Sequence, residues 1–150
     1  MFHSSNPTLF GRPPGVLADA DALASAVSTL REVGISLQGG GISARALSAS
    51  HALTRISDHL SAYLDAEEGS GYLNAIGAQS ALFRFRVNAL ETAHRELRDA
   101  VSSAEQWAAV LSDSDAPEFG RRIANIVDQL EQHDEAERDL FQDFFLQYRP

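Results

Sequence analysis

The stretch IANIVDQLEQHDEAERDLFQDF, residues 123–144, carries the pattern from which the fold is predicted. Its inward-facing positions recur at alternating spacings of three and four residues, the period of one face of an α-helix. These positions are Ile123, Ile126, Leu130, His133, Glu137, Leu140 and Phe144. Two of them are polar, and a buried imidazole or carboxylate needs a compensating partner. The stretch therefore predicts a long amphipathic helix with a polar site on its buried face.

The same spacing extends outward from this stretch through most of the chain. Helices are expected over residues 16–33, 43–68, 79–111 and 115–148. Gly34, followed by Gln38 and the three glycines at 39–41, is expected to break the first helix. The third helix is expected to bend or break near Ser102 and Ser103. No segment shows the strict alternation of a half-buried strand. Four helices joined by short connections predict an all-α protein, an antiparallel up-and-down four-helix bundle.

The length of the chain, 150 residues, is typical of a single domain with its own core. Residues 1–15 contain three prolines and two glycines, which predict an irregular N-terminal arm. Residues 16–150 would then form the bundle. Phe145 and Leu146 lie on neighbouring faces at the end of the fourth helix, where they could serve a homodimer interface or dock the arm.

The composition excludes several classes of function. Without cysteine there are no disulfides, thiolate metal sites or cysteine nucleophiles, and all 12 basic residues are arginine, so there is no Schiff-base lysine. A net charge of −9 disfavours binding to nucleic acid or to anionic membranes. No apolar run approaches the roughly 20 residues of a transmembrane helix, and the N-terminus does not resemble a signal peptide. We therefore expect a cytoplasmic protein.

Polar residues interrupt the apolar stripes of three of the expected helices. His133 and Glu137 are one turn apart on the fourth helix, His94 lies on the third, and Glu67 follows Tyr63 by one turn on the second. In an antiparallel bundle, groups from three helices can meet at one depth of the core. Imidazoles and carboxylates, at about 2.0–2.2 Å, are ligands that iron, zinc or manganese accept. The pattern favours a metal site built from these residues.

Each of these residues also has a purely structural interpretation. His133 and Glu137 could form a hydrogen-bonded pair within one helix, and His94 could be a core histidine satisfied by a carboxylate. Tyr63 could be a packed tyrosine with one hydrogen bond. His51 and His59 lie beside the stripe of the second helix and are interpreted as surface residues or as neighbours of the ligands.

Three segments resemble the ligand-bearing helices of hemerythrin-like (HHE cation-binding) proteins. They are HDEAERDLF (residues 133–141), LSAYLDAEEGSGYL (residues 60–73) and ALETAHREL (residues 89–97). The resemblance implies an up-and-down bundle around a non-haem di-iron centre. It also implies that Glu67 and Glu137 bridge the irons and that His94 and His133 are terminal ligands. Proteins of this kind bind or sense oxygen, handle peroxide or nitric oxide, or report iron.

The chain departs from the family pattern at two positions. The first-helix histidine should fall near Ala20, where Asp19 and Asp21 flank an alanine, and Tyr63 replaces the second-helix histidine. A phenolate can ligate ferric iron, so Tyr63 is either a substitute ligand or a core tyrosine beside a reduced site. The remaining ligand set could hold two irons, one ion or none.

Three functions are therefore expected from the sequence. The first is a non-haem iron protein that binds, senses or detoxifies an oxygen species or iron, with a small diatomic molecule or peroxide as its ligand. The alternative is a metal-free hemerythrin-like bundle that acts as a structural or protein-interaction module. The third is a redox enzyme, for example with peroxidase-like activity, in which the missing histidines leave an open coordination position.

Overall fold

The computed structural model describes residues 14–38 and 43–147, and the side chains of residues 23–38 and 48–147. The helices of the described residues are α1 (Pro14–Gln38), α2 (Ser43–Ser70), α3 (Tyr72–Gly77), α4 (Ala81–Ala108) and α5 (Ala116–Gln147), with a short 3-10 turn at Asp113–Asp115. No strand occurs among these residues. The prediction of an all-α protein is confirmed.

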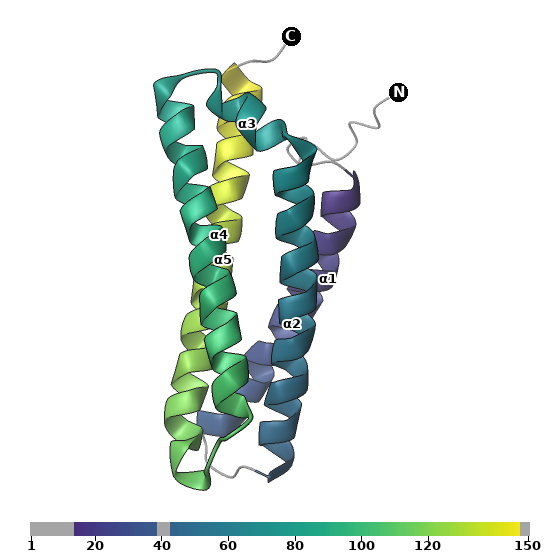
Figure 1. Ribbon diagram of the computed structural model, residues 1–150, viewed down its shortest axis with the longest axis vertical. Coiled ribbons are helices and arrows are strands. Elements are labelled where there is room, and N and C mark those ends of the chain that lie inside the picture. Colours follow the sequence, from purple (N-terminus) through teal and green to yellow (C-terminus); the bar gives the residue numbers. More distant parts are fainter. Residues whose placement is uncertain (1–13, 39–42, 148–150) are drawn as a thin grey trace.

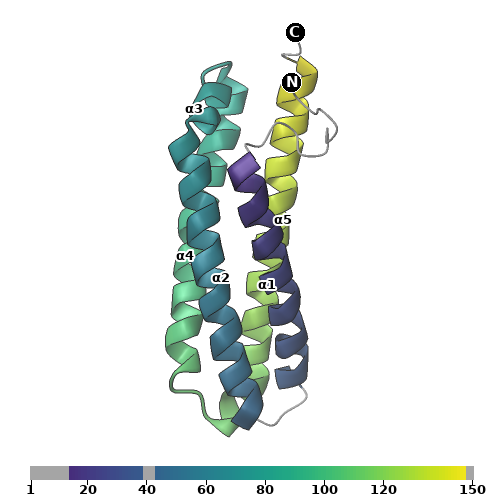
Figure 2. The same cartoon turned by 90° about the vertical axis from the view of Figure 1, so that its right-hand side faces the viewer.

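The four long helices lie side by side, and consecutive ones run in opposite directions (Figures 1 and 2). α1 packs against α2 and α5, and α4 packs against the same two helices. The short helix α3 lies at one end, where it connects α2 to α4 (Figure 1). None of the described helices is both long and apolar enough to span a membrane.

Helix α1 does not end at Gly34, so that prediction is wrong. The helix continues to Gln38 because Gly34 lies against Gly120 of α5. A Cβ atom at Gly34 would lie 2.7 Å from Cγ2 of Ile123, and one at Gly120 would lie 2.9 Å from the carbonyl oxygen of Gly34. The missing side chains allow the two helices to approach closely, and this packing outweighs the cost of about 1 kcal/mol for a glycine within a helix.

Helix α4 is one uninterrupted helix, and the predicted bend near Ser102 is also wrong. Ser102 and Ser103 are both exposed, so they face solvent and leave the buried stripe of α4 intact. The helix begins two residues later than expected, where the hydroxyl of Ser80 accepts a hydrogen bond from the backbone N–H of Phe83 at 3.1 Å. This contact satisfies one of the free donors of the first turn.

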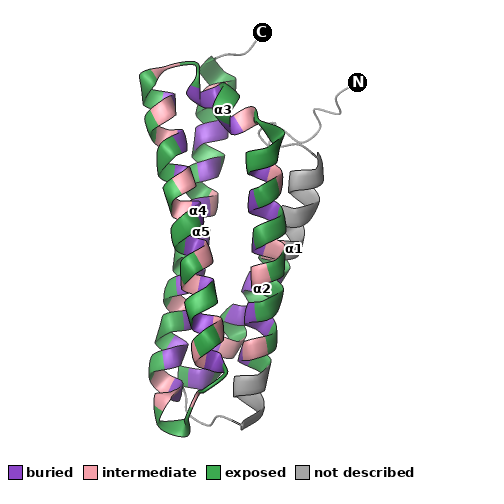
Figure 3. Ribbon diagram, in the orientation of Figure 1, coloured by how far each residue is buried: buried purple, intermediate pink, exposed green. Residues whose placement is uncertain are grey.

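Most of the buried residues form two apolar clusters, and they line the inward faces of the helices (Figure 3). The larger cluster, the main core, contains Leu30, Leu53, Ile56, Phe119 and Ile123 among others and joins α1, α2, α4 and α5. The smaller cluster, the end core, contains Leu73, Ile76, Phe83, Val87, Leu90, Leu140 and Phe141 from α3, α4 and α5.

Four buried polar residues separate the two apolar clusters along the helices. On α4, His94 lies between Leu90 of the end core and Leu97 of the main core. On α5, His133 and Glu137 follow the main core and precede the end core. Together with Glu67 of α2, these residues form what we call the polar layer.

The predicted N-terminal arm, residues 1–15, lies outside the described residues except at its end. Pro14 and Gly15 already belong to α1. At the other end of the chain, the predicted dimer residues Phe145 and Leu146 are exposed on α5.

Candidate metal centre

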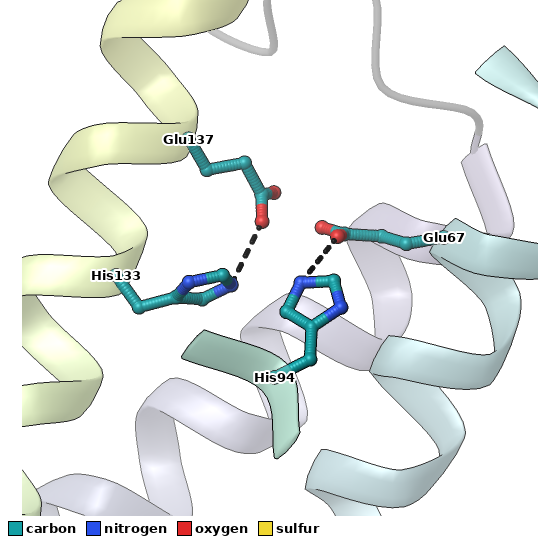
Figure 4. A group of neighbouring side chains, drawn as sticks. All are labelled: Glu67, His94, His133 and Glu137. Atoms are coloured by element: carbon teal, nitrogen blue, oxygen red, sulfur yellow. Dashed lines mark ion pairs between the residues drawn. The ribbon is translucent and has the colours of Figure 1, made fainter. Parts of the chain in front are cut away.

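The side chains of the polar layer converge from three helices on one space (Figure 4). Glu67 comes from α2, His94 from α4, and His133 and Glu137 from α5. Glu67, His94 and Glu137 are fully buried, and His133 is 6% exposed. Each residue offers one nitrogen or oxygen donor atom, and these four atoms all lie within 4.8 Å of one another. The structure thus brings together four of the five residues that the sequence predicts as metal ligands, all except Tyr63.

His94 is held between two carboxylates of α2. Its Nδ1 atom lies 3.2 Å from Oε1 of Glu68, and its Nε2 atom lies 3.4 Å from Oε2 of Glu67. Burial lowers the pKa of His94, the nearby His133 lowers it further, and Glu68 opposes the shift. The imidazole is therefore neutral near pH 7. With Glu68 as acceptor, we assign the proton to Nδ1, which leaves the lone pair on Nε2.

His133 packs against His94 and lies close to Glu137. The two imidazole rings have centroids 4.7 Å apart and meet edge to face at 74°. Nε2 of His133 lies 3.2 Å from Oε2 of Glu137, one turn away on α5. Neither ring nitrogen of His133 forms a hydrogen bond with any described residue, although both are buried. Nε2 of His94 likewise forms none, so three buried ring nitrogens of the layer have no hydrogen bond to a described residue.

Tyr63 joins the polar layer through Glu137. Its buried hydroxyl donates a hydrogen bond to Oε1 of Glu137, which connects α2 to α5. The sequence leaves open whether Tyr63 is a ligand or a packed tyrosine with a hydrogen bond. In the structure, Tyr63 makes the hydrogen bond to Glu137.

Sequence reasoning missed the role of Glu68. This residue is part of the segment that resembles the family, but its spacing places it beside the buried stripe of α2. Its side chain is 43% exposed and nevertheless reaches Nδ1 of His94. The one available signal is its position next to Glu67, because a carboxylate that orients a ligating histidine is a common arrangement.

Two surface grooves reach the polar layer at His133. A groove of about 280 Å³ runs between α1, α2 and α5, and both Tyr63 and His133 line it. A second groove of about 430 Å³ lies between α4 and α5 and is lined by His133 alone among the residues of the layer. Small molecules therefore have a short path to the edge of the site.

The other residues considered in the sequence do not take part. His51 is exposed and His59 is partly exposed, and neither belongs to the four-residue group. The side chains of Asp19, Ala20 and Asp21 lie outside the described residues.

Comparisons with known proteins assign no family to this chain. Neither the models of protein families, nor the curated proteins, nor the solved structures gave a match to this chain. The arrangement provides two imidazole nitrogens and two carboxylate groups in a buried space between the two cores. Such a donor set can bind a transition-metal cation.

Proposed function

We propose that the protein is a hemerythrin-like helical bundle that binds iron in its polar layer. Its ligands are Glu67, His94, His133 and Glu137. The bound iron would serve to bind, sense or detoxify an oxygen species, or to report iron. The observation that carries the proposal is the convergence of four buried donors within 4.8 Å of one another. The choice of iron rests on the resemblance of three sequence segments to hemerythrin-like proteins, because the same donors also suit zinc and manganese.

The residues fit a bound cation in their hydrogen bonding. Both ring nitrogens of His133 and Nε2 of His94 are buried and form no hydrogen bond to a described residue. A buried polar group in this state costs about 1–3 kcal/mol. A metal ion that accepts the lone pair of each ring removes most of this cost.

The residues also fit a bound cation in their charge. Two carboxylates lie in the layer, and the lowered pKa of His94 keeps that imidazole neutral, so it does not balance them. Burying a carboxylate without a compensating charge is strongly unfavourable. A divalent cation would neutralise both carboxylates.

The surrounding residues have defined tasks in such a site. Glu68 fixes the orientation and the tautomer of His94, and Tyr63 holds one oxygen of Glu137. Along the helices, the main core lies on one side of the site and the end core lies on the other. Iron, when bound, supplies a Lewis-acid and redox centre, and the groove between α1, α2 and α5 gives a small ligand access.

The test is the metal content and the ultraviolet–visible spectrum of protein produced with added iron and purified without chelator. We expect bound iron in the native protein and its loss in His133→Leu and in Glu137→Gln. Glu135→Gln is the matched control, since Glu135 is exposed on the same helix. Retention of the native iron content by both ligand variants would sink the proposal.

The second candidate, a metal-free structural or protein-interaction module, is favoured by one observation. Tyr63 and Glu68 already satisfy part of the polar layer without an ion. On this reading, His133→Leu leaves stability unchanged or raises it under all conditions, because an apolar side chain replaces a buried polar one. The module is contradicted if the variant is much less stable than the iron-loaded native protein but as stable as the metal-free native protein.

A further inference from the structure

We infer that the polar layer binds one metal ion through four donor atoms, two nitrogens and two oxygens, and not a pair of ions. The inference rests on the proposed function, but it departs from the di-iron centre that the resemblance implies. Three features of the site lead to it: the spacing of the donors, the atoms already engaged by neighbouring residues, and the charge of the layer.

The donors are close enough to share one centre. Four points that lie within 4.8 Å of one another all fit in a sphere of radius about 2.9 Å, so each donor would move less than about 1 Å to reach a bond of roughly 2.0–2.2 Å. In a tetrahedral site with such bonds, neighbouring donors lie about 3.3–3.6 Å apart. The contact from His94 to Glu67 is 3.4 Å, and that from His133 to Glu137 is 3.2 Å.

One oxygen of Glu137 is already engaged by a neighbouring side chain. A carboxylate that bridges two ions through both oxygens places one oxygen on each ion. Oε1 of Glu137 accepts the hydrogen bond of Tyr63, and Oε2 is the oxygen that lies beside His133. The hydrogen bond from Tyr63 therefore favours Oε2 as the oxygen that Glu137 offers to an ion.

The donors that remain are too few for a second ion. Nδ1 of His94 is engaged by Glu68, so His94 offers Nε2 alone. Within the described part of the chain, the group contains no histidine or acid besides Glu67, His94, His133 and Glu137. A second ion would have to share these four ligands with the first.

The charge of the polar layer also favours one ion over two. The two carboxylates carry at most two negative charges, which one divalent ion cancels. A second divalent ion would leave an uncompensated double positive charge between two apolar cores, and isolated charges are strongly disfavoured there. One ion therefore matches both the donors and the charge.

The test is a titration of the metal-free protein with Co²⁺ and, without oxygen, with Fe²⁺. Co²⁺ reports geometry, because a four-coordinate ion absorbs visible light much more strongly than a six-coordinate one. We expect saturation at one ion per chain, with the four-coordinate cobalt spectrum. After air oxidation, the iron-loaded protein should show the electron paramagnetic resonance signal of an isolated high-spin ferric ion.

The outcomes separate this inference from the proposed function. Saturation at two ions, with a coupled ferric pair that gives no such resonance signal, would overturn the single-ion site while the iron-binding function stands. Absence of any binding would overturn both. A single ion bound with a six-coordinate cobalt spectrum would overturn the four-donor geometry.

Tyr63→Phe tests the role assigned to the tyrosine. We expect this variant still to bind one ion, with affinity about 10–100-fold lower because Glu137 is less well oriented. A phenolate-to-iron absorption band in the native protein that disappears in the variant would overturn the assignment, since it would make Tyr63 a ligand.

Glu68→Ala and Glu68→Gln test the orientation of His94. The alanine variant should lose affinity by about 10–100-fold, and the glutamine variant should recover most of it, because an amide oxygen can still accept from Nδ1. Asp65→Ala controls for removal of an acid from α2, since Asp65 pairs with Arg98 on the surface. Equal affinities in all three variants would show that Glu68 does not position His94.

Discussion

The main core and the polar layer are equally buried, but burial has opposite energetic consequences in the two regions. Phe119 and Ile123 in the main core are fully buried, as are Glu67 and Glu137 in the polar layer. Apolar side chains gain about 25 cal/mol for each Å² removed from water and need no specific partner. Buried carboxylates and imidazoles lose solvation and depend on hydrogen bonds or an ion to offset that loss. The main core is thus stable by packing alone, whereas the polar layer depends on hydrogen bonds or on a bound ion.

The largest expected effect comes from removing a side chain of the main core. Phe119→Ala should lower the free energy of unfolding by about 3–5 kcal/mol, because it leaves a cavity beside Trp107, whose ring centroid lies 5.2 Å away. Urea denaturation measures this change. The folded fraction should still bind metal with native stoichiometry, since Phe119 does not touch the polar layer. A loss below about 1 kcal/mol would contradict the contribution assigned to the main core.

The second effect is the stability that a metal ion adds to the polar layer. At a free ion concentration of about 100 times Kd, the free energy of unfolding should rise by about 2.7 kcal/mol, because the ion binds the folded state. Thermal or urea denaturation with and without the ion gives the difference. Glu137→Gln should abolish the increase and Glu135→Gln should preserve it. An equal increase in both variants would place the bound ion elsewhere.

A smaller effect is expected where the packing of the main core depends on shape. Gly120→Ala should destabilise the protein by about 1–3 kcal/mol, because the added Cβ would lie 2.8 Å from Cγ of Gln38 and 2.9 Å from the carbonyl oxygen of Gly34. Gly69→Ala is the matched change in α2, where the added Cβ meets no atom within 4 Å. That variant should gain about 0.5–1 kcal/mol from helix propensity. Similar effects in the two variants would show that the α1–α5 approach is not tightly packed.

The smallest effect is the pH dependence of the metal-free protein. The pKa of His94 is lowered by burial, so as the pH falls below its ordinary value of about 6.5 the unfolded state takes up a proton first. Stability is complete above this pH and falls progressively toward the folded-state pKa. His94→Gln should reduce this dependence, measured by urea denaturation at several pH values. His51→Gln, at an exposed histidine, is the matched control.

Much of the architecture was predictable because helix periodicity records which positions are buried. The stripes indicated the four long helices and placed Glu67, His94, His133 and Glu137 on buried faces, as the structure does. The role of Gly34 was not predictable. Its meaning depends on Gly120 of α5, a neighbour that lies far away in the sequence, and not on the local preference of glycine.

The contacts within the polar layer also could not be predicted from the sequence. Spacing along one helix does not determine which side chains meet across helices. It placed Tyr63 one turn before Glu67, whereas the hydroxyl of Tyr63 bonds to Glu137 of α5. For the same reason it could not show that Glu68, on a half-exposed face, turns toward His94.

The division of the interior into two apolar cores with a polar layer between them has an evolutionary consequence. Each core consists of its own apolar side chains and includes none of the four polar residues. A lineage that exchanges the four ligands together for leucine or methionine can therefore keep a foldable protein, whereas the loss of one alone leaves a buried polar partner uncompensated. Selection for stability alone would favour this exchange of polar for apolar residues. If diverged descendants keep all four polar residues, this would indicate that they still bind the ion. If the descendants have lost different members of the set, this would indicate that the bundle serves another function.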